Sequence, residues 1–342
     1  MFGMAGGLAA GTGGGFGAAV DTQLVDVDTS AYINNGAEVL GAGGIKVQAD
    51  SVEKITSLAL QASAGGEFAG AGAANAHKVD VDTLAWIGSE KDSDAGRVEF
   101  GYGKPDVGKV SILASDDAVL KVNAAQGAGA GEVAGGLSIG VAVVDKNVKA
   151  AAENIWTNNV GLLVDAQNTG SVLTTANGVA GAGAVALTGS ASESMITYTT
   201  DAHIGKKATI TASRGAVSVN AKSRFTHVGE AAGVSGAGEV AGGLSNDTTY
   251  IKNDTKAYIG KKAFVNTRYG IAVTADHTTD ITSAVVAGGF AKTAAFNGGV
   301  GVNKLRENVQ AYVDDAATLR VIAAQDDKGK ATLVNVSAKN TT

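Results

Sequence analysis

The segment Thr255–Ala275 reads TKAYIGKKAFVNTRYGIAVTA and contains two short motifs that recur along the chain. The first centres on Ala257, and its six copies place alanine at positions 31, 85, 150, 202, 257 and 311, which are 54, 65, 52, 55 and 54 residues apart. The second, an IxVxA pattern, ends in alanine at positions 49, 114, 166, 221, 275 and 338. Two motifs with nearly the same period predict an array of repeats.

Longer identities show that the repeats are duplications of one unit. The decapeptide GAGEVAGGLS occupies residues 129–138 and again 236–245, and the pentapeptide VDVDT occupies 25–29 and 79–83. We therefore treat residues 1–342 as a single repeat array. Its six units have the approximate boundaries 1–60, 61–124, 125–176, 177–230, 231–288 and 289–342.

The IxVxA motif alternates apolar and mostly polar residues, as in Ile45-Lys46-Val47-Gln48-Ala49. Such alternation predicts a β-strand with one buried face. A unit of about 54 residues cannot bury its apolar face alone, so stacked units predict an all-β parallel β-solenoid. We expect several short strands and two or three coils per unit, with polar pairs such as Asp50-Ser51 as turns. The alternative architecture is a large β-sandwich or a multi-domain β array.

Composition supports an ordered, sheet-like chain. Glycine accounts for 49 residues and proline for one, yet the hydrophobic fraction is 45% and the charged fraction only 18%, unlike a disordered linker. Gly/Ala blocks precede most KAYIG-type motifs, and we expect them to let two sheets approach closely. Residues 1–20 carry no charged side chain and are interpreted as the first such block, not as a membrane span or a signal segment.

Charge and cysteine content limit the classes of function. The formal net charge of −6, without a lysine or arginine cluster, argues against a nucleic-acid partner. The absence of cysteine removes disulfides and thiolate metal sites, and it suits a protein that is exported through an oxidising compartment. We therefore expect a secreted protein.

The order of a Gly/Ala block, a TKAYIG-type motif (Thr255–Gly260) and an IxVxA strand (Ile271–Ala275) resembles the repeats of large bacterial exoproteins. These include leukotoxin-like filamentous adhesins and filamentous-haemagglutinin-type passengers. The resemblance covers essentially the whole chain, and it implies a β-solenoid body at the bacterial cell surface with a part in attachment, biofilm or toxin delivery. The sequence departs from those families because it has no recognisable secretion domain, outer-membrane barrel or wall anchor. We expect a fragment or a small polymerising relative.

Candidate chemistry is sparse. Asp26 and Asp28, like Asp80 and Asp82, place two carboxylates on one face of a strand, which is compatible with Ca²⁺ binding or acid–base chemistry. Later units have Lys252 or Arg306 at the first of these positions, so solvated outer-face charges are the preferred interpretation. Four histidines, at positions 77, 203, 227 and 277, lie far apart in the sequence. We predict no catalytic, cofactor-binding or metal-binding residues and no enzymatic activity.

One further pattern points to the outer surface. The residue after the alanine of the first motif is aromatic or histidine in five units, at Tyr32, Trp86, His203, Tyr258 and Tyr312. In a stacked array these side chains form a column that either binds sugars, mediates lateral association or covers neighbouring loops.

These observations predict a non-enzymatic structural and adhesive scaffold that self-associates end to end or laterally, with a host or matrix glycan or protein as a further partner. The alternative is a polysaccharide-binding or polysaccharide-cleaving β-helix protein. We also expect surface loops at the two insertions, residues 89–108 and 323–330.

Overall fold

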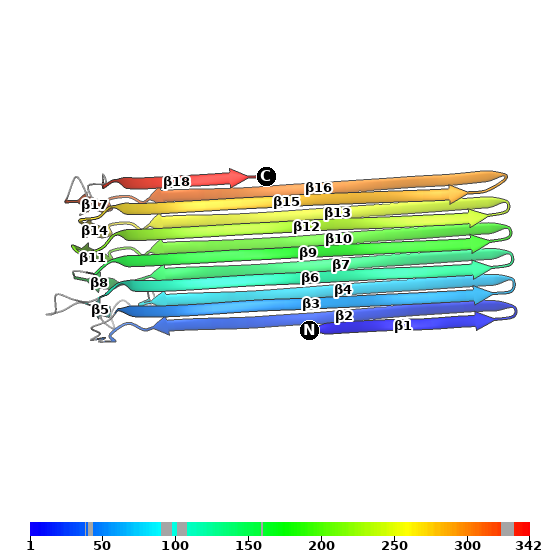
Figure 1. The fold of residues 1–342 in the computed structure, drawn as a ribbon, viewed down its shortest axis with the longest axis horizontal. Coiled ribbons are helices and arrows are strands. Elements are labelled where there is room, and N and C mark those ends of the chain that lie inside the picture. The colour runs from blue at the N-terminus through cyan, green and yellow to red at the C-terminus, as the bar shows by residue number, and fades with distance from the viewer. Residues whose placement is uncertain (38, 40–43, 90–97, 101–107, 159, 323–331) are drawn as a thin grey trace.

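The computed structural model describes the whole chain except residues 38, 40–43, 90–97, 101–107, 159 and 323–331. The described residues form strands, turns and connecting segments, with no helix among them. All strand pairs in the three sheets are parallel, and successive turns of the chain lie on top of one another (Figure 1). The protein is thus a parallel β-solenoid, as the repeats predicted.

Three sheets run along the solenoid, and we name them by length. Sheet A contains, in spatial order, β1 (Phe2–Gly11), β3 (Ile45–Gly65), β6 (Val110–Ala130), β9 (Leu162–Ala182), β12 (Val217–Ala237), β15 (Ile271–Phe290) and β18 (Val334–Thr341). Sheet B contains β2 (Gly14–Ile33), β4 (Phe68–Ile87), β7 (Val133–Ala152), β10 (Val185–Ile204), β13 (Val240–Ile259) and β16 (Ala294–Val313). Sheet C contains the short strands β5 (Val98–Phe100), β8 (Ile155–Thr157), β11 (Thr209–Ala212), β14 (Phe264–Thr267) and β17 (Thr318–Val321).

Each sequence repeat makes one coil, which corrects our expectation of two or three. The chain follows a strand of sheet A, reverses in a turn of two residues (three between β15 and β16), returns along sheet B and then passes through sheet C. Ala257 pairs with Ala202 of one neighbouring coil and with Ala311 of the other. A full-length strand of 20 residues is about 66 Å long, whereas six strands at about 4.8 Å span about 29 Å. The molecule is accordingly longest along its strands and does not form a slender rod (Figure 1).

The polar pairs after the IxVxA motif do not turn the chain, contrary to our expectation. Asp50 and Ser51 lie inside β3, and Ser51 is buried in the interior. Asn168 occupies the matching position of β9 and is buried as well. Pairing with the coils above and below keeps these residues extended, and it overrides the local preference of Asp, Asn and Ser for turns.

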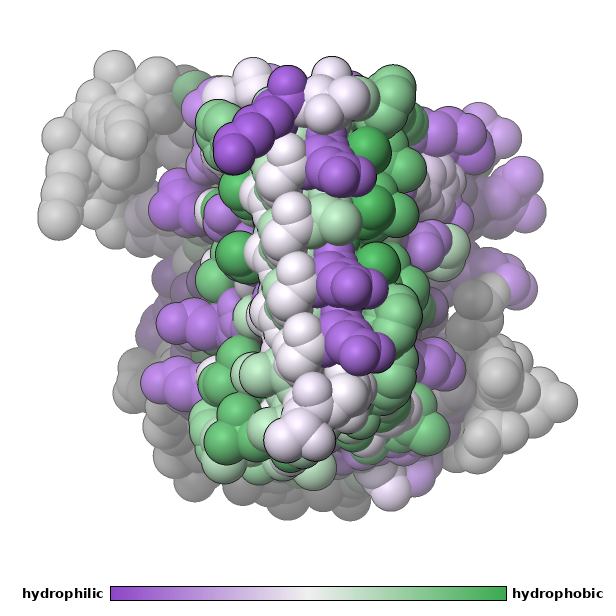
Figure 2. Space-filling view, turned by 90° about the vertical axis from the view of Figure 1, so that its right-hand side faces the viewer, coloured by the Kyte–Doolittle hydropathy of each residue, from purple (hydrophilic) through white to green (hydrophobic). Residues whose placement is uncertain are grey.

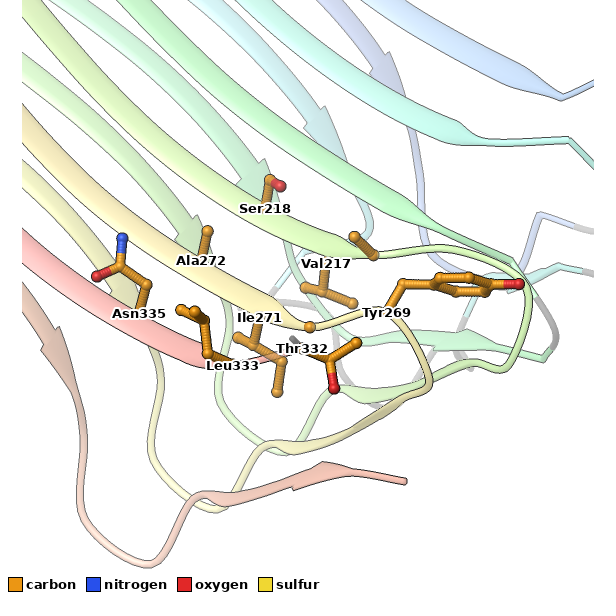
Figure 3. A pocket seen from close by; sticks show the side chains of 10 residues that line it. Val217, Ser218, Tyr269, Ile271, Ala272, Thr332, Leu333 and Asn335 are labelled. Carbon is orange, nitrogen blue, oxygen red and sulfur yellow. The ribbon is translucent and has the colours of Figure 1, made fainter. Parts of the chain in front are cut away.

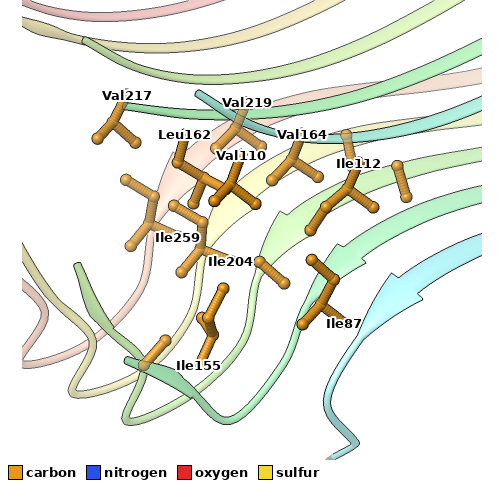
Figure 4. Packing of buried hydrophobic residues seen from close by; sticks show 14 of the residues in the cluster. Ile87, Val110, Ile112, Ile155, Leu162, Val164, Ile204, Val217, Val219 and Ile259 are labelled. Carbon is orange, nitrogen blue, oxygen red and sulfur yellow. The ribbon is translucent and has the colours of Figure 1, made fainter. Parts of the chain in front are cut away.

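The interior changes character along the strands. Near sheet C it is filled by large aliphatic residues of all three sheets, including Ile112, Ile155 and Ile259, together with the inward alanines of both motifs (Figure 4). Near the two-residue turns the core consists of alanine, for example Ala134, Ala180 and Ala186. The two main sheets approach closely there, since a Cβ on Gly15 of β2 would overlap the carbonyl oxygen of Ala64 in β3. This confirms the expected role of the Gly/Ala blocks.

Candidate binding surface on sheet B

The predicted aromatic column exists on the outer face of sheet B. Strand pairing places Tyr32, Trp86, Ala151, His203, Tyr258 and Tyr312 at one register position. The rings of Tyr32 and Trp86 stack with centroids 4.6 Å apart, those of His203 and Tyr258 at 4.6 Å, and those of Tyr258 and Tyr312 at 5.0 Å. The alternating pattern of the first motif produces this arrangement, because Ala257 points inward while Tyr258 points outward.

Ala151 divides the aromatic column into two blocks. It belongs to the unit in which the first motif is degraded, and it stands between Trp86 and His203. One block therefore contains two rings and the other contains three. Tyr32 is 53% exposed, whereas His203 is buried, so the column is most accessible at its first ring.

His203 is held by two carboxylates. Its Nδ1 lies 2.6 Å from Asp201 Oδ1, and its Nε2 lies 2.8 Å from Glu153 Oε1. Burial by itself lowers the pKa of His203, but the hydrogen bonds and negative charges of Asp201 and Glu153 outweigh it, so the pKa is raised. Burial alone would raise the pKa of Glu153, and the bond to His203 lowers it below its ordinary value. The three groups form a charged cluster that fixes the imidazole ring in the column.

The carboxylate pairs singled out in the sequence lie beside the column, on the outer face of sheet B. Asp26 and Asp28 are exposed, in line with their interpretation as outer-face charges. Asp80 lies 3.8 Å from Lys78, and Asp82 accepts a hydrogen bond of 3.0 Å from Asn147. Within the described residues, no group of three or more His, Asp or Glu side chains is arranged to hold a metal ion.

The residues that pair in register with Asp26 across sheet B form what we call the charged row. Across the six strands it contains Asp26, Asp80, Asp145, Thr197, Lys252 and Arg306. Burial, followed by the charges of Asp80 and Asp82, raises the pKa of Asp145. The sequence had revealed the change from Asp to Lys or Arg in later units. The pairing shows that the change follows spatial order, with acidic coils at one end and basic coils at the other.

The other three histidines lie inside the solenoid and do not form a common site. His77 Nε2 contacts Asn75 Oδ1 at 2.8 Å, His227 Nε2 contacts Thr249 Oγ1 at 2.9 Å, and His277 Nε2 contacts Glu307 Oε1 at 3.1 Å. Burial lowers the pKa of each of them. They are interior residues whose hydrogen bonds join sheet A to sheet B or link neighbours on one strand.

A shallow hollow opens at the start of β12, β15 and β18 (Figure 3). It is lined by uncharged side chains, among them Val217, Ile271 and Leu333, with Tyr269 at one side. This hollow brings together none of the candidate residues from the sequence.

The two predicted loop insertions fall largely outside the described residues. In the first, Val98–Phe100 forms β5 and pairs with β8. The second, at 323–330, is not among the described residues. The described part of the chain also holds no helix long and apolar enough to span a membrane.

Comparison with known proteins gives no relative for this chain. No protein-family model matches it, and neither the curated proteins nor the solved structures provide a match. The class of protein is therefore defined by the fold alone, which is a parallel β-solenoid with one coil per repeat.

Proposed function

We propose that this chain is a structural and adhesive scaffold of a bacterial surface, secreted and without enzymatic activity. The observation that carries the proposal is the in-register ladder of sheet B. Its strands pair over 20 residues each, so every outward side chain belongs to a column that crosses all the coils. Such a framework repeats one surface chemistry many times, which suits attachment and assembly better than catalysis at a single site.

The proposed location and role rest on the resemblance of the repeats to those of large bacterial exoproteins. Absence of cysteine agrees with export, and long ladders of backbone hydrogen bonds suit a protein exposed to the surroundings of a cell. Biofilm or host attachment and end-to-end or lateral self-association are the corresponding activities.

The aromatic column also favours the alternative function, polysaccharide binding. The rings are stacked 4.6 to 5.0 Å apart with their faces toward one another, so a glycan would contact the edges of the column, above all at the exposed ring of Tyr32. A chain that bound glycans through this surface would still be a scaffold, because the coils supply the spacing of the rings.

The test is retention on beads that carry the purified chain. Scaffold function predicts that the beads retain bacterial cells, a matrix polysaccharide or a matrix protein without releasing new reducing ends. Replacement of both Tyr258 and Tyr312 by Ser is expected to abolish retention of polysaccharide if the column binds it. The Val179→Ser variant, which changes an exposed side chain on the outer face of sheet A, serves as the control. Beads that retain nothing would contradict the adhesive role, and release of reducing ends would contradict the absence of catalysis.

A further inference from the structure

The charged row on sheet B has opposite signs at its two ends. Asp26 and Asp80 belong to β2 and β4, whereas Lys252 and Arg306 belong to β13 and β16. Spatial order in the sheet is β2, β4, β7, β10, β13, β16, so the acidic coils and the basic coils are separated by the two middle strands. A face with this arrangement is complementary to itself after a half-turn.

The half-turn that matches the charges has its axis parallel to the strands. It places β2 of one molecule opposite β16 of a second, β4 opposite β13, and β7 opposite β10, while each position along the strand is kept. Asp26 then faces Arg306 of the second copy, and Asp80 faces its Lys252. Four positions further along, Lys149 of β7 faces Asp201 of β10. Each of these pairs occurs twice in a two-fold dimer.

One pair of like charges also comes into opposition, and one of its two members already has a cationic partner. Asp82 would face Asp254 of the second copy. Asp82 accepts a hydrogen bond from Asn147, and Asp254 forms a 2.6 Å ion pair with Lys256. The balance of charges across the face is therefore attractive.

The apolar half of the same face is complementary as well. Near the turns, an apolar hollow lies over β2, β4 and β7; it is lined by Phe16, Leu137 and glycines that include Gly70 and Gly135. The half-turn sets this hollow opposite β10 and β13 of the second copy. Those strands present Leu187 and Leu244, which are 52% and 67% exposed.

Both leucines thus meet glycines, because Gly135 faces Leu187 and Gly72 faces Leu244 at the same strand positions. On the outermost strands, Phe16 of β2 faces Phe296 of β16. Figure 2 looks onto the turns that join sheet A to sheet B, and it shows hydrophobic side chains on both sides of the row that these turns form. Sheet B forms one of these two sides.

The face is also large enough for a stable dimer. Six strands of about 20 residues cover about 1,900 Å² in projection, and a specific interface needs about 800 Å² per partner. Two sheets pack face to face at about 10 Å separation, and the strands of the two copies run nearly parallel here so that the charged row and the apolar hollow both meet their counterparts.

We infer that the outer face of sheet B binds a second copy of this chain, face to face, with the order of coils reversed. The interface joins the charged row to the charged row of the partner and the apolar hollow to Leu187 and Leu244. The inference rests on the lateral self-association named in the proposed function and assigns it to one face, and it does not depend on cellular location. The dimer and the adhesive role can be told apart by their tests, because the oligomeric state of the purified chain decides dimerisation whereas retention on the beads decides attachment.

Charge exchange tests the inference on the purified chain by sedimentation velocity between about 1 and 100 µM, a range that detects dissociation constants down to the weak micromolar class. The wild type is expected to dimerise. Its dimer should dissociate more readily as salt is added, because salt screens the attraction between the opposite charges at the interface. Asp80→Lys and Lys252→Asp are each expected to raise the dissociation constant about tenfold or more, since each places like charges in opposition twice. The double variant D80K/K252D is expected to recover most of the affinity, because the pair is restored with its signs exchanged.

A matched pair of apolar substitutions separates this face from the other one. Leu187→Glu on sheet B is expected to prevent dimerisation, whereas Val179→Glu on the outer face of sheet A leaves it intact; the two side chains are similarly exposed. A wild type that remains monomeric at 100 µM would overturn the inference, as would a double variant no tighter than its parents. Open-ended polymers that are insensitive to both charge exchange and Leu187→Glu would equally overturn it, since they would point to association through the strand edges.

Discussion

The ammonium group of Lys146 on β7 and the carboxylate of Asp116 on β6 form an ion pair inside the solenoid, with both side chains completely buried. Lys146 Nζ also donates a 2.7 Å hydrogen bond to the carbonyl oxygen of Thr169, and it lies 5.5 Å from the ring centroid of Tyr198. Burial, only partly offset by Lys146, raises the pKa of Asp116 to about 6, and burial lowers the pKa of Lys146. The pair links the two main sheets between two apolar clusters.

Replacing only one member of the Lys146–Asp116 pair should lower the free energy of unfolding far more than replacing both. The Lys146→Met variant leaves the Asp116 charge buried without compensation, and we expect a loss of about 3–5 kcal/mol in the free energy of unfolding. The double variant K146M/D116L should recover most of that loss, because no buried charge remains. Urea denaturation followed by circular dichroism measures both values.

The loss of unfolding free energy in the Lys146→Met variant, which we call its stability deficit, should also depend on pH. A carboxyl whose folded pKa is raised above its unfolded value contributes stability that is lost as the pH rises through the folded pKa. The deficit should therefore be larger at pH 8 than at pH 5. Equal deficits at both pH values, or a double variant as unstable as K146M, would show that the pair is not an isolated buried charge pair.

The sequence predicted the features that every coil repeats. Inward alanines such as Ala257 and the stacking of Tyr258 on Tyr312 follow from the period and the alternation of two motifs. The polar interior could not be predicted in this way. Asp116 and Lys146 are not repeated in other coils, and they meet only after β6 and β7 have folded against each other, so no local pattern marks them.

The length of the strands could not be predicted from the sequence, for a related reason. Polar residues such as Ser51 and Asn168 look like turn residues in a single repeat, but in register they form a buried polar layer between apolar ones. The charged row was visible only as a list of substitutions from unit to unit. Its spatial order, from Asp26 to Arg306, required the pairing of the strands.

His203 should make the protein less stable as the pH rises. Its folded pKa lies above the ordinary value of 6.5, although burial opposes this, because Asp201 and Glu153 hold the charged form. The stability it contributes is fully present below about pH 6.5 and is lost as the pH rises through the folded pKa. The difference in unfolding free energy between the wild type and His203→Gln should therefore shrink from pH 6 to pH 9. A difference that stays constant over this range would refute the assignment.

His227 should have the opposite dependence. Burial lowers its pKa despite the charge of Asp247, and its Nδ1 donates a 3.1 Å hydrogen bond to the carbonyl oxygen of Val172. Below about pH 6.5 the unfolded chain takes up a proton that the folded chain resists, so stability falls as the pH falls. The advantage of the wild type over His227→Gln should shrink between pH 7 and pH 5, as measured by urea midpoints. Parallel behaviour of the two histidine variants would contradict the distinction between outer and inner histidines.

Gly170 faces the buried ring of Tyr198 across the interior, and a Cβ at this position would lie 2.6 Å from the Tyr198 hydroxyl oxygen. Tyr198 is held edge-on against Phe225, with ring centroids 4.6 Å apart, so the ring has little room to move. We expect Gly170→Ala to lower the free energy of unfolding by about 1–3 kcal/mol, the usual cost of overpacking.

Gly127 provides the control, because a Cβ there meets no atom within 4 Å. Gly127→Ala should be neutral or slightly stabilising, since alanine reduces the conformational freedom of the unfolded chain. The variant G170A/Y198F tests the cause, because removal of the hydroxyl relieves the contact and should return part of the lost stability. If G170A were as stable as G127A, the packing of Tyr198 against Gly170 would not limit the interior at this level of the solenoid.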